Sequence, residues 1–285
     1  MAAGSYRRRI QKVAWPCAGS KKSHCTASAK RNSTAMKKSK HQRYLICVLT
    51  IVLATCPRLS IAQRADESRQ TLSEKEVAIV LIGSYTAKGD LTKLAPALHA
   101  ALDAGVTVNE CKEVLVHLYA YCGFPRSIQG LNTLMAVLDE RKAKGIKDTM
   151  GREATPFPDA DRYEVGWKNL AKLGGRPADG PIEKPASGYG AFSPEMDRFL
   201  KEHLFADLFS RDVLTFAERE LTTISVLIAL GSGVEPMLAS HLGLTLEQGI
   251  TPDQIHEVFA LIEKSVSKPD AEAARKVFSA RASRN

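Results

Sequence analysis

An internal duplication constrains the fold of this chain more than any other feature of its sequence. When the sequence is shifted by 144 residues, residues 76–114 align without a gap with residues 220–258, and ten of the 39 aligned positions are identical. Most of the identical residues are Leu, Ala, Gly or Thr, which pack helices or mark their ends. We therefore predict two pseudo-symmetric repeats, residues 73–145 and 194–280, joined by a Gly/Pro-rich connector at residues 146–193.

The formal charge of +9 is unevenly distributed along the chain. Residues 1–62 contain 13 Lys and Arg and no Asp or Glu, so 27 basic and 31 acidic side chains remain in residues 63–285. The body of the protein therefore carries a small negative net charge. This excludes nucleic acid as the expected partner.

The basic N-terminal region has the pattern of a secretory signal. Residues 36–40 are basic, residues 45–55 are apolar, and Ser60-Ile61-Ala62 is a small-x-small cleavage site. The apolar run is much shorter than the ~20 residues of a membrane-spanning helix, so we expect no stable membrane anchor. We predict a signal peptide at residues 36–62, cleaved after Ala62 into a secreted or periplasmic protein, with residues 1–35 as an upstream extension from a misassigned start. A lipoprotein modified at Cys56 is the alternative.

Cleavage at that site would leave Cys111 and Cys122 as the cysteines of the mature chain. On a continuous helix their spacing would separate them by ~16 Å, which is beyond the reach of a disulfide. We therefore expect no internal disulfide.

Helical spacing of apolar residues runs through both repeats, and the helix starts are marked by capping boxes. Ser73-x-x-Glu76 and Thr107-x-x-Glu110 are such boxes, and Thr251 precedes a proline at the first helical position. Gly105 and Gly249 suit the left-handed position that ends a helix. We expect a short helix at residues 167–173, another at 194–209, and no strands, hence an all-α fold. Glu113 and His117 lie opposite the apolar face of their helix, so we expect an exposed i,i+4 pair, with contact to a partner subunit as the alternative for either residue.

Two segments resemble the carboxymuconolactone decarboxylase family. The first spans residues 98–125 and contains Ala104-Gly105-Val106-Thr107 and Tyr121-Cys122-Gly123-Phe124-Pro125; the second repeat contains Arg219-Glu220-Leu221-Thr222 and Ser240-His241-Leu242. The family shares its all-helical fold with the AhpD-type alkylhydroperoxidases, which use a Cys-x-x-Cys pair supported by a Glu and a His. The resemblance implies the AhpD-like helical fold and a homotrimer or larger homo-oligomer.

The resemblance also assigns candidate site residues. It places the family's Glu at Glu220 and its His at His241, while the two thiol positions fall near Val234 and Met237. His241 is matched by Ala97 in the first repeat. A pKa near neutrality suits a histidine for proton transfer, although a histidine at the edge of an apolar face is equally an ordinary structural residue. In the first repeat, Glu76 is explained as a member of the capping box with Ser73. Ala217 occupies the position that corresponds to Ser73, so helix capping does not explain Glu220 in the same way.

Three further residues are candidates on chemical grounds. Arg211 and Arg219 lie in the polar segment that leads into the second repeat, where an Arg is either a surface charge or a bidentate clamp for a substrate carboxylate. Cys122 precedes a predicted helix break at Gly123, where it is either a reactive thiol or a small buried residue. The chain has no spacing typical of a metal site and no nucleotide-binding loop, so we expect no metal and no cofactor.

The leading hypothesis is an exported, cofactor-free lyase that acts on a small carboxylated lactone or a related acid. Arg219 or Arg211 would hold the carboxylate, and His241, oriented by Glu220, would protonate carbon. One alternative is a thiol-dependent hydroperoxide reductase with peroxiredoxin-type activity that uses Cys122. The other is a non-catalytic helical binding module.

Overall fold

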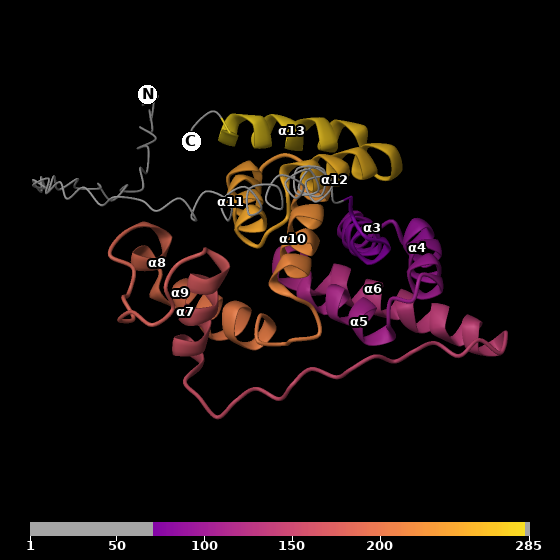
Figure 1. Ribbon diagram of the computed structural model, residues 1–285, viewed down its shortest axis with the longest axis horizontal. Coiled ribbons are helices and arrows are strands. Elements are labelled where there is room, and N and C mark those ends of the chain that lie inside the picture. Colours follow the sequence, from indigo (N-terminus) through magenta and orange to yellow (C-terminus); the bar gives the residue numbers. More distant parts are fainter. Residues whose placement is uncertain (1–70, 283–285) are drawn as a thin grey trace, which may run out of the picture. The chain divides into compact units, whose positions relative to one another are not determined.

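The computed structural model describes residues 71–282, and these are helical with connecting loops and no strands. This confirms the all-α prediction (Figure 1). The predicted start at Met36, the cleavage after Ala62 and the alternative at Cys56 lie outside the described residues. Within residues 71–282, no helix combines the length and the hydropathy needed to span a bilayer.

The first half of the described chain forms four helices: α3 (Glu74–Lys88), α4 (Leu91–Asp103), α5 (Val108–His117) and α6 (Tyr119–Ala143). The predicted capping boxes of α3 and α5 are both present, with the side chain of Ser73 accepting from the Glu76 N–H and that of Thr107 from the Glu110 N–H. Helix α6 is broken at Gly123, whose φ of 83° and ψ of 159° suit only glycine. The helix break predicted at this position is therefore confirmed.

The second half contains α10 (Phe216–Leu230), α11 (Glu235–Glu247), α12 (Pro252–Ser265) and α13 (Lys268–Ala282). Helices α4 and α11 are both 13 residues long, and their bounds differ by 144 residues. Gly105 and Gly249 have φ of 85° and 87°, so both adopt the expected left-handed conformation. This correspondence agrees with a duplication, which itself stays a prediction.

Helices of both halves bury their apolar faces in one core. Helix α3 packs along α10, and α13 lies across α11 and α12 (Figure 1). The core includes Leu94, Leu98 and Leu115 from the first half and Leu221, Leu242 and Phe259 from the second.

The connector takes part, together with the π-helix η2 (Leu200–Leu208), in a second, smaller hydrophobic cluster. Helix α7 (Arg162–Leu173) begins at its N-cap Asp161 and is longer than the predicted helix at residues 167–173. It packs along η2 so closely that a Cβ on Gly166 would lie 1.8 Å from the Lys201 carbonyl oxygen. The short helices α8 (Gly188–Phe192) and α9 (Pro194–Phe199) precede η2. The predicted helix at residues 194–209 is thus formed by α9 and η2, and its second part is a π-helix.

Candidate functional site

Glu220 and His241 meet across two consecutive antiparallel helices. Helix α10 carries Glu220 in its second turn, and α11 returns His241 after the turn at residues 231–234. Nδ1 of His241 lies 2.8 Å from Oε2 of Glu220. Glu220 is fully buried, whereas the His241 side chain retains 14% of its exposure. The contact expected between these two residues is therefore present.

The capping of α10 explains why Glu220 is free to make this contact. The helix begins at Thr215, whose side chain accepts from the Glu218 N–H while the Glu218 carboxylate accepts from the Thr215 N–H. Glu218 therefore fills the role that Glu76 has in α3. The sequence Thr215-x-x-Glu218 is a capping box that the sequence comparison of the repeats did not reveal, because it lies two residues upstream of the aligned position.

The geometry of this pair assigns its protons. A carboxylate only accepts hydrogen bonds, so Nδ1 of His241 carries the hydrogen and Nε2 is the nitrogen left to exchange a proton. This is the arrangement in which a carboxylate fixes the tautomer of a histidine and stabilises its imidazolium form. The second oxygen of Glu220, Oε1, is buried and has no hydrogen-bond partner among the described residues.

Tyr121 covers the other side of the His241 ring. The two rings meet edge to face, with centroids 5.5 Å apart and an interplanar angle of 86°. The break at Gly123 follows Tyr121 by two residues. The Tyr121 hydroxyl is buried, and burial, followed by the charge of Glu220, raises the pKa of this group.

A buried ionic cluster adjoins this site and corrects one prediction. Glu113 and His117 were expected to be an exposed pair, but both are buried, with exposures of 1% and 0%. Glu113 binds Arg219 at 2.8 Å and Arg211 at 3.0 Å. The prediction failed because α5 is covered on more than one face: α3, α6 and α10 all pack against it. A single apolar stripe in the sequence cannot reveal this.

His117 is held in one neutral tautomer. The Arg219 guanidinium can only donate, so Nδ1 of His117, 3.2 Å from Nη1, must accept. The Nε2 hydrogen then points to Oγ1 of Thr223 at 3.1 Å, and Thr223 donates to the Arg219 carbonyl oxygen. Burial, and then the positive charge of Arg219, lowers the pKa of His117 well below its ordinary value. His117 therefore has a structural role, as the acceptor of a hydrogen bond from Arg219, and does not serve as a general acid.

The two candidate arginines occupy different places. Arg219 is fully buried; besides Glu113 and His117 it contacts the Arg211 carbonyl oxygen, so it lies inside the protein and not at a surface where a substrate could reach it. Arg211 is partly exposed and lines a cavity of about 440 Å³. His241 is not among the residues that line this cavity.

Cys122 and Cys111 are both free thiols. Sγ of Cys122 donates to the Leu118 carbonyl oxygen at 3.3 Å, and burial raises its pKa to about 11. Burial raises the pKa of Cys111 to about 12. Among the described residues, no group of three or more His, Cys, Asp or Glu side chains is arranged to hold a metal ion.

Removing the central carboxylate tests the ionic cluster. We expect Glu113→Ala to destabilise the protein by about 3–5 kcal/mol, because it leaves a buried guanidinium without its counter-ion. The matched control is Glu257→Ala, at the aligned position of the second repeat, where the carboxylate accepts from the Leu72 N–H at 2.7 Å. That change should cost about 1 kcal/mol. Urea unfolding measures both, and equal effects would contradict the structural role of Glu113.

Comparison with known proteins gives two results. Residues 194–280 match the model of the carboxymuconolactone decarboxylase family, and these residues include η2, Glu220 and His241. The chain is also similar to 4-carboxymuconolactone decarboxylase from Acinetobacter baylyi (strain ATCC 33305 / BD413 / ADP1), with 26% identity over 116 residues, which are 41% of this chain and 83% of the relative. The resemblance predicted from the sequence is thereby confirmed for residues 194–280, which carry the sequence pattern of the carboxymuconolactone decarboxylase family.

Proposed function

We propose that this protein is a decarboxylase-type lyase that acts on a small carboxylated lactone or a related acid. The observation that carries the proposal is the Glu220–His241 hydrogen bond of 2.8 Å, made between a buried carboxylate and a partly exposed imidazole. Both residues lie in the part of the chain that matches the carboxymuconolactone decarboxylase family. The relative from Acinetobacter baylyi, named as 4-carboxymuconolactone decarboxylase, supports the same class of reaction.

The proposed reaction needs one proton. When the bond from the substrate carbon to its carboxylate breaks, CO₂ leaves and the electron pair remains on the conjugated lactone as an enolate. Protonated His241 then gives the hydrogen on Nε2 to carbon, and the imidazole regains a proton from solvent. Glu220 fixes the tautomer and the orientation of the ring through its hydrogen bond to Nδ1.

The position of Arg219 changes the proposed role of the arginines. Because Arg219 is enclosed by Glu113, His117 and the Arg211 carbonyl group, we assign it to the structural cluster and not to substrate binding. Its guanidinium group holds His117, whose ring lies 5.4 Å from that of Tyr121. Arg219 therefore supports the proposed site from the side of His117.

The thiol-dependent alternative gains no support from the thiols. A peroxide is attacked by a thiolate, and a pKa of about 11 leaves Cys122 protonated at neutral pH. Cys122→Ser should therefore leave the proposed activity unchanged. The non-catalytic alternative, a helical binding module, is tested by the activity measurement itself.

Activity measurements on site variants test the proposal. With a panel of carboxylated lactones, His241→Asn should lower CO₂ release by about 100-fold or more, because a general acid contributes ~10²–10⁴-fold. Glu220→Gln keeps the shape of the side chain but removes its charge, and should also lower the rate. His99→Gln, which changes a partly exposed histidine of α4, is the control and should have no effect. Release of no CO₂ by the wild type, or full activity of His241→Asn, would overturn the proposal.

We also propose that the protein is exported. The support is the basic, apolar and small-x-small pattern of residues 36–62. N-terminal sequencing of protein recovered from outside the cytoplasm should find Gln63 as the first residue. A first residue of Cys56 would establish the lipoprotein alternative, and any other would contradict both.

A homotrimer or larger assembly is the third part of the proposal. Helix α6 exposes Phe124, Ile128 and Met135, which are 61%, 51% and 63% exposed and recur at helical spacing along one side. Such a row on a single chain is typical of a surface that another subunit covers. Light scattering at micromolar concentration should give at least three times the mass of one chain, and a monomer would contradict this expectation.

A further inference from the structure

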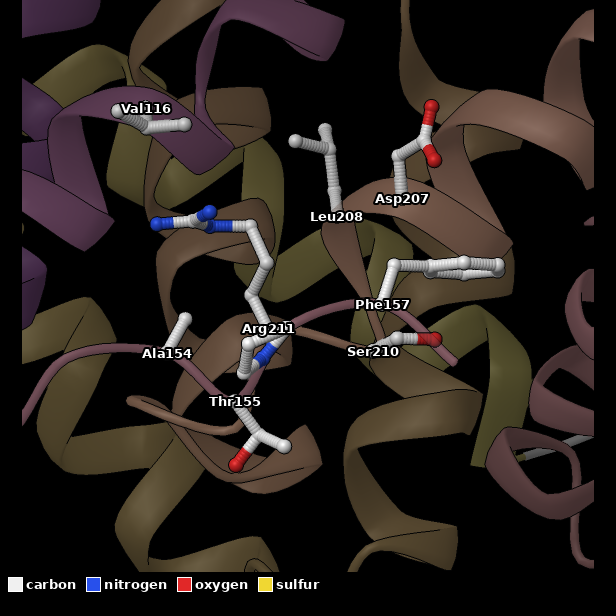
Figure 2. Close-up of a pocket in the computed structure, with 9 residues that line it drawn as sticks. Val116, Ala154, Thr155, Phe157, Asp207, Leu208, Ser210 and Arg211 are labelled. Carbon is white, nitrogen blue, oxygen red and sulfur yellow. The ribbon is translucent and has the colours of Figure 1, made fainter. Parts of the chain in front are cut away.

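The cavity that Arg211 lines does not include Glu220 or His241 in its lining and has a volume of about 440 Å³. Figure 2 shows the residues that line it. They come from three places: Val116 of α5, the end of η2 with the loop after it, and residues 154–157 of the connector. A cavity of this size lies in the range of small-molecule sites.

The connector wall of the cavity is fixed in place. We call residues 151–157 the strap. The Asn109 side chain donates to the carbonyl oxygens of Gly151 and Arg152, at 3.2 and 3.1 Å. Thr155 donates its backbone N–H and its hydroxyl to the Asp212 carboxylate, at 2.9 Å each. The strap lies outside the residues that match the family model, so this wall is a feature of this chain and not of the matched region.

One end of the cavity carries a guanidinium group. Figure 2 shows the Arg211 side chain extending toward Val116, away from Asp207 and Ser210. Arg211 binds Glu113 through Nε and Nη2, and its Nη1 has no partner among the described residues. Because Glu113 also neutralises Arg219, one buried carboxylate serves two guanidinium groups. The exposed carboxylate of Glu153 is the other negative charge that acts on Arg211.

The remaining lining is apolar or already bonded. Val116, Pro156, Phe157 and Leu208 supply apolar surface. Both oxygens of Asp207 are occupied, one by Arg162 at 2.9 Å and the other by His203 at 2.9 Å, so its charge is compensated. Ser210 accepts from Asn169 at 3.0 Å, which leaves its hydroxyl hydrogen available.

We propose that this cavity binds a small monocarboxylate with a short apolar body. The carboxylate would accept from Nη1 of Arg211, the guanidinium nitrogen that Glu113 leaves without a partner. The apolar body would lie against Phe157, Leu208 and Val116. This inference does not rest on the proposed lyase activity, because His241 does not line the cavity and the test measures binding alone.

Phenylacetate and phenylacetamide are the probes, because they share one shape and differ in charge. Isothermal titration calorimetry should give phenylacetate at least about 10-fold tighter binding than the amide, as expected for a charge-assisted hydrogen bond. Arg211→Gln should abolish this preference. Lys172→Gln, which removes a charge from an exposed position of α7 outside the cavity, should preserve it.

A second variant keeps the test valid if Arg211→Gln disturbs the ionic cluster. Ala154→Phe fills the cavity from the strap without changing any charge, and it should weaken binding of both probes. The proposal is overturned if phenylacetate and phenylacetamide bind equally well or if neither binds. It is also overturned if phenylacetate binds a folded Ala154→Phe protein as tightly as the wild type.

Discussion

The buried pair of Glu113 and Arg219 links the two halves of this fold within their shared hydrophobic core. Burying two charges is costly unless further hydrogen bonds surround them. Glu113 also accepts from Arg211, and Arg219 also contacts His117 and the Arg211 carbonyl oxygen, while its Nε has no hydrogen-bond partner among the described residues. The pair therefore holds α5 against α10 with defined geometry. Through the rings of His117 and Tyr121, that geometry extends to His241, since successive ring centroids lie 5.4 and 5.5 Å apart.

The two halves of the described chain use the carboxylates at aligned sequence positions in opposite ways. In the first half Glu76 caps α3 at the surface and Glu113 is buried in the ionic cluster. In the second half Glu220 is buried beside His241, while Glu257 accepts a single backbone hydrogen bond from Leu72. Of the two aligned carboxylates in each half, one thus lies inside the protein. Because the buried carboxylate comes from a different position in each half, one stabilises the interface and the other orients an imidazole.

The sequence predicted the features that depend on local interactions. Capping boxes at Ser73, Thr107 and Thr251 placed helix starts, and Gly123 placed the break in α6, because these signals act within a few residues. The Glu220–His241 contact was predictable because 21 residues allow two helices and a turn. The burial of Glu113 and His117 was not predictable, since it depends on which neighbours cover α5. The cavity beside Arg211 also escaped prediction, because the strap reaches it only through tertiary hydrogen bonds to Asn109 and Asp212.

The contrast between His117 and His241 shows how one fold gives the same side chain two chemistries. His117 accepts from a guanidinium, so its protonation would place a second positive charge against Arg219 and is opposed. His241 instead donates its Nδ1 hydrogen to the Glu220 carboxylate, which fixes the tautomer of its ring. His117 is fully buried, whereas His241 keeps part of its surface, which is what proton exchange with a substrate requires. The partner of Nδ1 and the partial exposure of the side chain therefore favour His241 over His117 as the proton donor of the proposed reaction.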